Sequence, residues 1–146
     1  MKIAVASDHA GYELKKKVID LLKMMGHQVL DFGTYSNDPV DYPDFALPAA
    51  EAVASTIADM GILICGTGIG MAIVANKVQG IRAADCTTEE MARMARRHNN
   101  ANILTLGSRI LTNQQAEDII RAFLSEDFEG GRHMIRIEKI HRNTGR

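Results

Sequence analysis

Residues 61–70 read GILICGTGIG, an apolar run that passes directly into a glycine-rich loop. The run ends at Cys65 and is too short for a helix, so it predicts a buried β-strand. The three glycines of the loop let the backbone approach a ligand closely, and successive N–H groups can form a nest for an anion. A helix is expected to follow over residues 71–77. A buried strand, a glycine-rich loop and a helix in this order indicate a protein in which strands and helices alternate.

The rest of the chain repeats this alternation. Four other short apolar segments predict strands at residues 2–7, 27–32, 81–85 and 102–106. Helical spacing and helix-start signals predict five more helices. The first occupies residues 14–25, the second ends near residue 56, the third runs from 87 to about 97, the fourth begins at 112 and the fifth runs from about 131 to 142. Capping boxes are predicted from Thr87 with Glu90 and from Thr112 with Gln115. Residues 33–48 hold all three prolines and predict a long loop.

The alternation predicts an α/β fold. Strand–helix–strand units build a mainly parallel sheet of five strands with helices on both faces, as in a doubly wound, Rossmann-like domain. A chain of 146 residues has the size of one domain, and we expect residues 1–146 to form a single one. Ligands of such folds bind beyond the carboxyl ends of the strands. The turns after the first, third, fourth and fifth strands are therefore expected to carry the site.

The composition excludes several classes of protein. Apolar residues make up 46% of the chain, and 17 basic residues stand against 18 acidic ones, for a net charge of -1. Such a chain has no global field that attracts nucleic acid or an acidic membrane. Its apolar runs are far shorter than a membrane span, and its first residues enter a polar turn too early for a secretory signal. Two cysteines make no disulfide framework. We expect a cytoplasmic protein with no nucleic-acid or membrane partner.

The glycine loop matches none of three familiar phosphate-binding motifs. A dinucleotide fingerprint and a Cys-x5-Arg phosphatase loop both need another residue where Met71 stands, and the Gly-Lys-Ser/Thr ending of a Walker loop is absent. Cys65, at the junction of strand and loop, is either a buried strand residue or a reactive thiol, and the residues alone leave both interpretations open. Cys86 follows a strand without such a loop and is interpreted as structural.

Other polar candidates follow a strand or end a helix. Asp8 and His9 follow the first strand, and Asp8 is interpreted as a helix N-cap or a site residue, two roles that are compatible. His98 and Asn99 end an arginine-rich helix, where a histidine either complements the helix dipole or takes part in catalysis. The five histidines show no ligand spacing such as HxxxH, so no metal site is expected.

The C-terminal segment is locally basic. Residues 130–146 hold five lysines or arginines against one acid. Arg132 and Arg136 are four residues apart and share one helical face. They form either a solvated basic face or a clamp of two guanidinium groups for a phosphate. Nucleic-acid binding is not favoured, because no aromatic residue is interleaved with the charges.

Taken together, six ordered motifs resemble the family of ribose-5-phosphate isomerase B and the galactose-6-phosphate isomerase subunits. The motifs are residues 7–11, 40–44, 65–70, 75–77, 97–102 and 130–133. The resemblance covers essentially the whole chain. Some members of this family carry a glutamate just after the glycine loop in place of the cysteine. Met71 stands at that position here, so the chain resembles the cysteine subgroup.

The resemblance implies an aldose–ketose isomerase. It implies interconversion of D-ribose 5-phosphate and D-ribulose 5-phosphate through an enediolate, in the pentose phosphate pathway, with neither metal nor cofactor. It also implies a homodimer, or a higher oligomer, whose active sites lie at the subunit interface.

The resemblance also implies roles for individual residues. Cys65 is expected to be the base that moves the proton between C1 and C2, with the Thr67 hydroxyl beside the thiolate. His98 is expected to open the furanose ring, with Asp8 nearby. His9, Arg132 and Arg136 are expected to bind the phosphate. The whole substrate-binding set is Asp8, His9, Tyr42, Gly66, Thr67, Gly68, Ile69, Gly70, Asn99, Arg109, Arg132 and Arg136.

Two other functions stay open from the sequence. One is an isomerase of the same class that acts on a hexose phosphate, because the motifs do not fix the depth of the pocket. The other is a non-catalytic module that binds a phosphometabolite or a flavin. Aromatic residues make up 5% of the chain and tryptophan is absent, so few side chains are available to stack on a flavin ring.

Overall fold

Strands and helices alternate along the chain as far as the fifth strand. The computed structural model describes residues 1–146. Its strands are β1 (Lys2–Ser7), β2 (Gln28–Asp31), β3 (Met60–Cys65), β4 (Ala83–Asp85) and β5 (Ile103–Gly107). Its helices are α1 (Tyr12–Met24), α2 (Pro43–Ala54), α3 (Ile69–Ala75), α4 (Glu89–Asn99), α5 (Asn113–Ser125) and α6 (Arg132–Thr144).

The five strands form one sheet in the order β2-β1-β3-β5-β4, and every pairing is parallel. The predicted α/β fold with a five-stranded, mainly parallel sheet is confirmed. The chain moves from β1 outward to β2 and then returns to the other side of β1 as β3. This reversal makes a switch point between β1 and β3, and doubly wound sheets bind ligands in the crevice that such a switch leaves at the carboxyl ends of the strands.

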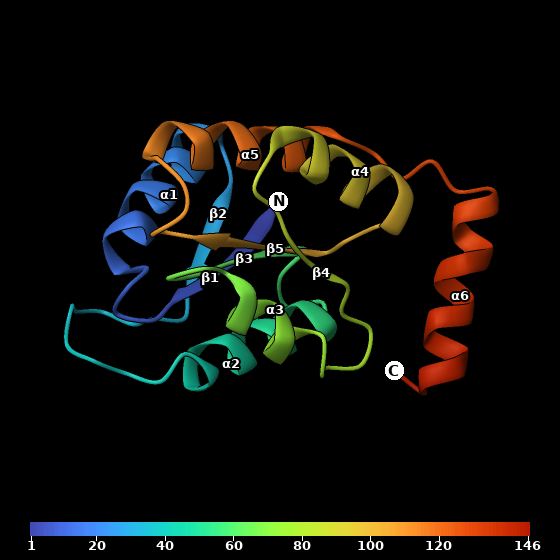
Figure 1. Ribbon diagram of the computed structural model, residues 1–146, viewed down its shortest axis with the longest axis horizontal. Coiled ribbons are helices and arrows are strands. Elements are labelled where there is room, and N and C mark those ends of the chain that lie inside the picture. The colour runs from blue at the N-terminus through green and yellow to red at the C-terminus, as the bar shows by residue number, and fades with distance from the viewer.

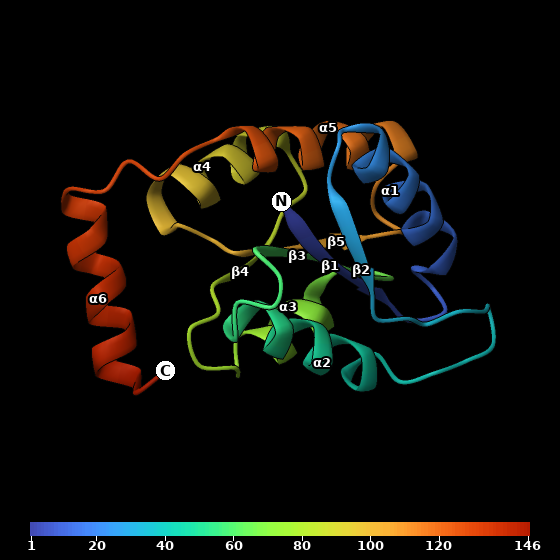
Figure 2. The same cartoon turned by 180° about the vertical axis from the view of Figure 1, so that it is seen from behind.

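Helices cover both faces of the sheet. Successive strand residues point to opposite faces, so Ile62 and Ile64 pack with α1, α4 and α5, whereas Leu63 and Cys65 pack with α2 and α3. Figures 1 and 2 show the two helical layers on either side of the sheet. Burial on both faces explains why β3 is an unbroken apolar run, since helices cover both sides of its residues 61–64.

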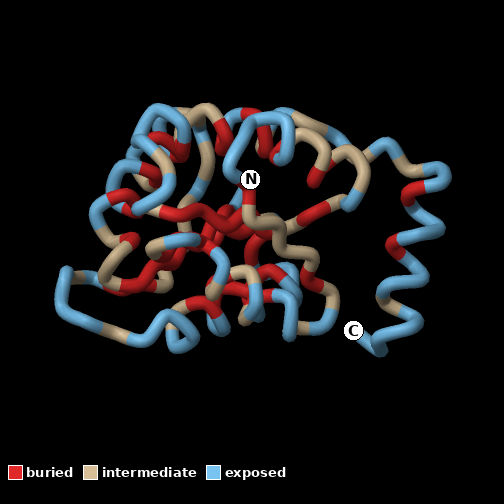
Figure 3. The backbone as a smooth tube through the Cα atoms, viewed as in Figure 1, coloured by how far each residue is buried: buried red, intermediate tan, exposed pale blue.

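Helix α6 stands apart from the two layers. In Figure 1 it lies at one end of the molecule, beyond β4 and the end of α4, and Figure 3 shows that most of it is exposed. Ile135 and Ile140 are 58% and 48% exposed. The end of the chain is tied to the body, because Arg146 donates a hydrogen bond to the Lys77 carbonyl over 2.7 Å.

The loop between β2 and α2 is anchored by a buried ion pair. Lys15 is 1% exposed, and its Nζ lies 2.6 Å from Asp31 Oδ1. The same oxygen accepts a hydrogen bond from the N–H of Gly33. A buried ammonium group is tolerated only with such a partner. The pair therefore fixes the start of the loop that leads to Tyr42.

Three predicted boundaries were wrong. Helix α2 begins at Pro43, inside the predicted 33–48 loop, because proline is well suited to the first turn of a helix, where its missing N–H costs nothing. Helix α3 begins at Ile69, two residues earlier than predicted. Helix α4 is capped by Thr88 rather than Thr87: Thr88 is extended, and its hydroxyl accepts a hydrogen bond from the N–H of Met91.

The other capping box is confirmed. Thr112 and Gln115 cap each other reciprocally at the start of α5. Helices α1, α5 and α6 have 13 residues each. No helix of the protein combines the length and the apolar character that crossing a membrane requires.

Candidate active site

Cys65 stands at the carboxyl end of β3, in the middle of the sheet. The strand residues before it, from Ile62 to Ile64, are fully buried, and Cys65 is 5% exposed. It is in register with Gly107 of β5. The central strand therefore fixes the position of the thiol, and only a small part of the residue contacts solvent.

The glycine loop wraps around the sulfur of Cys65. The N–H of Gly68 donates a hydrogen bond to Cys65 Sγ over 3.1 Å. Gly68 has a φ of 82°, in the left-handed region, and a Cβ at this position would overlap Asp85 Oδ1. Glycine is thus the residue that brings the N–H to the sulfur. An N–H donor at this place stabilises negative charge on the sulfur.

Thr67 organises the loop rather than the sulfur. Its Oγ1 accepts a hydrogen bond from the N–H of Ile69 over 3.3 Å. The family resemblance leads one to expect the hydroxyl beside the thiolate, whereas in this structure the donor to the sulfur is the Gly68 amide. Thr67 is exposed, and it lines the same cavity as Cys65.

A cavity of about 390 Å³ opens in front of Cys65. Eight predicted site residues line it: Asp8, Tyr42, Cys65, Gly66, Thr67, Ile69, Gly70 and Arg109. These residues come from the ends of β1 and β3, the start of α2 and the turn after β5. A Cβ on Gly70 would lie 2.7 Å from the Tyr42 ring, so the absence of a side chain there lets the ring close over the loop.

Asp8 and His9 turn the chain from β1 into α1. Asp8 is 8% exposed, and its Oδ1 accepts a hydrogen bond from the N–H of Gly11 over 3.0 Å. Gly11, not Asp8, is the N-cap of α1, and no side chain caps this helix. The alternative interpretation of Asp8 as a helix N-cap is therefore wrong, and its carboxylate closes the turn beside the cavity.

The ring of His9 is held by the loop before α2. The N–H of Val40 donates a hydrogen bond to His9 Nδ1 over 3.1 Å. Because a backbone N–H can only donate, Nδ1 offers its lone pair, and the neutral ring carries its proton on Nε2. The free nitrogen of His9 is thus a donor, which suits a phosphate or sugar oxygen.

The remaining predicted residues form a second group. His98 and Asn99 are the last two residues of α4, and Arg132 and Arg136 lie exposed on α6. The His98 ring stacks on the ring of His133, with centroids 4.2 Å apart and planes 11° apart. His98 Nε2 lies 3.5 Å from Glu129 Oε1.

Burial shifts the pKa of several side chains near the Cys65 cavity and near His98. Desolvation, helped by the positive charge of neighbouring His98 and Arg132, lowers the pKa of His133 below its usual value. Desolvation raises the pKa of Asp85, while the Thr105 hydroxyl opposes this effect. Burial, together with the Asp85 charge, raises the pKa of the Cys86 thiol to about 12. Cys86 is therefore a neutral thiol at physiological pH, as a structural residue should be.

The two groups lie at opposite ends of the sheet. The end of α4 leads into the amino end of β5, whereas Cys65 is beside its carboxyl end. The β5 arrow in Figure 1 points away from α6. Five residues of extended strand rise roughly 3.3 Å each. One small substrate cannot touch both Cys65 and His98 of the same chain.

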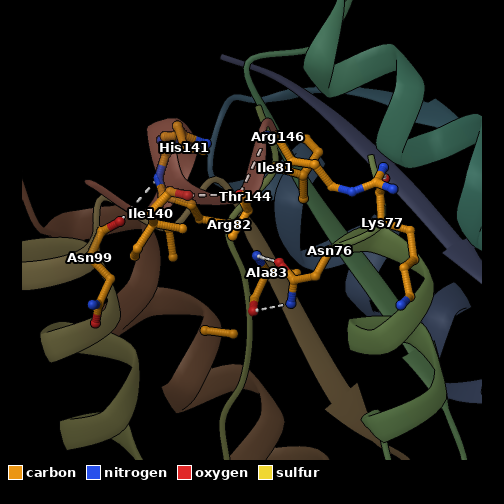
Figure 4. Close-up of a pocket in the computed structure, with 12 residues that line it drawn as sticks. Asn76, Lys77, Ile81, Arg82, Ala83, Asn99, Ile140, His141, Thr144 and Arg146 are labelled. Atoms are coloured by element: carbon orange, nitrogen blue, oxygen red, sulfur yellow. Dashed lines mark hydrogen bonds between the residues drawn. The ribbon is translucent and has the colours of Figure 1, made fainter. Parts of the chain in front are cut away.

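The largest cavity of the chain is elsewhere. It has a volume of about 530 Å³ and lies between α6 and the segment around β4, as Figure 4 shows. Lys77, Arg82 and Arg146 give it a basic lining, and Arg82 Nη1 lies 2.9 Å from His141 Nε2. Asn99 and His141 also line it. The smaller cavity is the one that contains Cys65.

The sequence analysis missed three residues of these groups. Asp85 lies half-buried against the glycine loop, and only the pairing of β4 with β5 reveals it. Glu129 and His133 flank the Gly-Gly pair, and the structure brings them to His98, 31 or more residues earlier in the chain. Their four-residue spacing is a weak signal, which becomes informative only when α4 is placed beside α6.

Comparison with known proteins gives the family. A family model described as Ribose/Galactose Isomerase matches residues 3–140. The chain is 45% identical over 139 residues to ribose-5-phosphate isomerase B of Escherichia coli (strain K12), covering 95% of this chain and 93% of that protein.

Solved structures agree closely. A ribose-5-phosphate isomerase B from Clostridium thermocellum superposes with a TM-score of 0.98 at 54% identity, over 99% of this chain and 98% of that one. The Mycoplasma genitalium enzyme with bound ribulose-5-phosphate superposes with a TM-score of 0.94 at 46% identity, over 99% and 96% of the two chains. The chain belongs to the Ribose/Galactose Isomerase family.

Proposed function

We propose that this protein interconverts D-ribose 5-phosphate and D-ribulose 5-phosphate, with Cys65 as the base. The observation that carries the proposal is the Cys65 sulfur at the cavity, held by the Gly68 N–H. The chain also matches proteins named ribose-5-phosphate isomerase B along nearly their whole length. One of these relatives has ribulose-5-phosphate bound.

The chemistry of aldose–ketose isomerisation matches these groups. The Cys65 thiolate takes the proton from C2 of the open-chain aldose, which leaves an enediolate and a neutral thiol. The thiol returns the proton to C1, and a proton moves between the oxygens on C1 and C2, so the ketose forms without a redox cofactor. Negative charge grows on oxygen in the intermediate, and preorganised N–H groups such as those of residues 66–70 stabilise it.

Ring opening requires a second acid or base, and we assign it to His98 of a neighbouring subunit. His98 cannot reach the cavity of its own chain, as the separation along β5 indicates. Exposed apolar residues on α3 and α6, among them Ile69, Ile73 and Ile140, offer surface for a homodimer. In such a dimer each site combines the Cys65 group of one chain with the His98 group of the other.

We further propose that Arg132 and Arg136 reach the phosphate across this interface, beside the Nε2 donor of His9. Both guanidinium groups are exposed on α6 in a single chain and lack a carboxylate partner.

A catalytic thiol also needs a reducing environment. The two free cysteines accordingly favour a place in the cytoplasm. The proposed substrate and product place the reaction in the pentose phosphate pathway.

The assay that tests the proposal measures conversion of ribose 5-phosphate to ribulose 5-phosphate with EDTA present. We expect full turnover, because none of the assigned steps uses a metal. Allose 6-phosphate and galactose 6-phosphate serve as comparison substrates, since the family description also covers galactose isomerases. Turnover of a hexose phosphate alone would replace the pentose assignment. Binding of all three sugars without turnover would identify a non-catalytic module.

Removing either guanidinium group should weaken phosphate recognition specifically. Each charge-assisted contact is worth about 1.5–3 kcal/mol, so Arg132→Ala or Arg136→Ala should lower kcat/KM for ribose 5-phosphate by roughly 10- to 150-fold. The loss should fall mainly on KM. Lys139→Ala, an exposed cation on the same helix, is the matched control and should leave KM unchanged. An equal loss for free ribose and for ribose 5-phosphate would contradict the phosphate-binding role.

A further inference from the structure

Three ligand-type side chains converge where the end of α4 meets the start of α6. They are His98, Glu129 and His133, and their ligand atoms lie within 4.8 Å of one another. Glu129 Oε1 is 3.5 Å from His98 Nε2 and 3.9 Å from His133 Nε2. We infer that these three residues form a binding site for a divalent transition-metal ion such as zinc, and that the bound ion takes His98 out of catalysis.

The donor set suits such an ion. Two imidazole nitrogens and one carboxylate oxygen are the protein ligands of many zinc sites that keep a fourth position open. Imidazole favours zinc, cobalt and nickel over magnesium or calcium. With metal–ligand bonds of about 2.0–2.2 Å, tetrahedral ligand atoms lie roughly 3.3–3.6 Å apart. The distance from His98 Nε2 to Glu129 Oε1, 3.5 Å, falls within this range, and the distance from His133 Nε2, 3.9 Å, lies above it.

The backbone holds the three residues together. The N–H of Glu129 donates to the carbonyl of Arg97, next to His98 in the chain, over 3.0 Å. His133 is 8% exposed, in the first turn of α6. The side chain of Glu129 is 46% exposed and free to turn toward either ring.

Occupation requires a limited rearrangement. The lone pair of an imidazole lies in the plane of its ring, and the two rings are nearly parallel. They must tilt out of the stack so that both lone pairs meet at one point. Arg132 and Arg136 add positive charge nearby, but both are exposed, so solvent and salt screen their repulsion. The three side chains are thus already close together, and the binding of an ion completes the site by turning the two rings.

Binding is tested with cobalt(II) on the purified protein without any substrate. We expect one ion per chain, with visible absorption bands typical of nitrogen and oxygen ligands at low coordination number. Loss of a residue that only hydrogen-bonds to a metal ligand weakens metal binding by roughly 10–100-fold. Glu129→Gln and His133→Gln each remove a ligand itself, so each should weaken cobalt binding by at least this factor. Glu138→Gln on α6 and His27→Gln, beside the N-terminal amine, are matched controls and should bind as the wild type.

Several outcomes would overturn the site. Absence of the bands would do so, as would equal affinity in Glu129→Gln, His133→Gln and the wild type. A thiolate-to-cobalt charge-transfer band that disappears in Cys65→Ala would move the ion to the cysteine. Glu129 is exposed, so its variant should fold, and circular dichroism checks this.

The inhibitory part rests on the proposed function. Zinc should inhibit isomerisation in the wild type, EDTA should restore it, and Glu129→Gln should resist zinc. Full isomerase activity of protein that has bound zinc would contradict the inhibition. The cobalt titration alone would then show whether the three residues bind an ion. If the protein shows no isomerase activity even with EDTA, the proposed function fails, whereas the cobalt titration still tests the metal site.

Discussion

Replacing Cys65 with alanine is expected to lower turnover of ribose 5-phosphate by about 10²–10⁴-fold, the usual contribution of a positioned proton-transfer group. The sulfur is the group at the cavity that accepts the Gly68 N–H, and Cys86 is buried with a pKa of about 12. Cys65→Ser should be almost as inactive, because the base is the ionised group, and a serine hydroxyl is hardly ionised at neutral pH whereas a thiol is partly thiolate. Steady-state kinetics in both directions measures the loss.

Cys86→Ala is the matched control for this prediction. It removes the other buried thiol from the hydrophobic core, so it should lower thermal stability while leaving turnover close to that of the wild type. Iodoacetamide provides a second check. Bound sugar phosphate should slow alkylation at Cys65 and leave Cys86 unaffected. Turnover near the wild-type value in Cys65→Ala or Cys65→Ser would rule out the thiol as the base.

The fold was predictable because its periodic signals are strong and local. β3 is buried on both faces, which leaves an apolar run that ends where the glycines begin. The start of α2 was missed because Pro43 breaks a helix in most positions but favours its first turn. The cap of α4 was misplaced because Thr87 and Thr88 are both suitable residues, and only the backbone conformation selects Thr88.

The candidate site was predictable in two different ways. The carboxyl-end rule for parallel sheets placed Asp8 and Cys65 together, and the structure brings Tyr42 and Arg109 to the same cavity. The roles of His98, Arg132 and Arg136 came only from the family resemblance. No periodicity within one chain can show that residues at opposite ends of a sheet act on one substrate, because their meeting depends on a second chain.

Mixing inactive variants should restore activity if the sites are shared between chains. Cys65→Ala and His98→Asn homodimers each carry damage in both sites. A mixed dimer has one site with both defects and one site with none. With random pairing about half the dimers are mixed, so about a quarter of wild-type activity should return, from nearly zero. Arg136→Ala should complement Cys65→Ala in the same way when turnover is measured well below KM, where Arg136→Ala alone is strongly impaired.

A pair from the same group provides the control. Asp8 and Cys65 line one cavity of one chain, so a mixed dimer of Asp8→Ala and Cys65→Ala has one defect in each site. This mixture should stay inactive. The comparison separates true complementation from a general effect of refolding, because both mixtures are unfolded, combined and refolded identically.

The most direct test of the account is therefore the activity of the refolded Cys65→Ala and His98→Asn mixture, with mixed dimers verified by mass spectrometry. A shared site predicts recovery to about a quarter of the wild-type rate, since equal subunit affinities give that share of intact sites. If mixed dimers form and the mixture remains as inactive as its components, Cys65 and His98 do not act together across an interface, and the proposed active site is wrong.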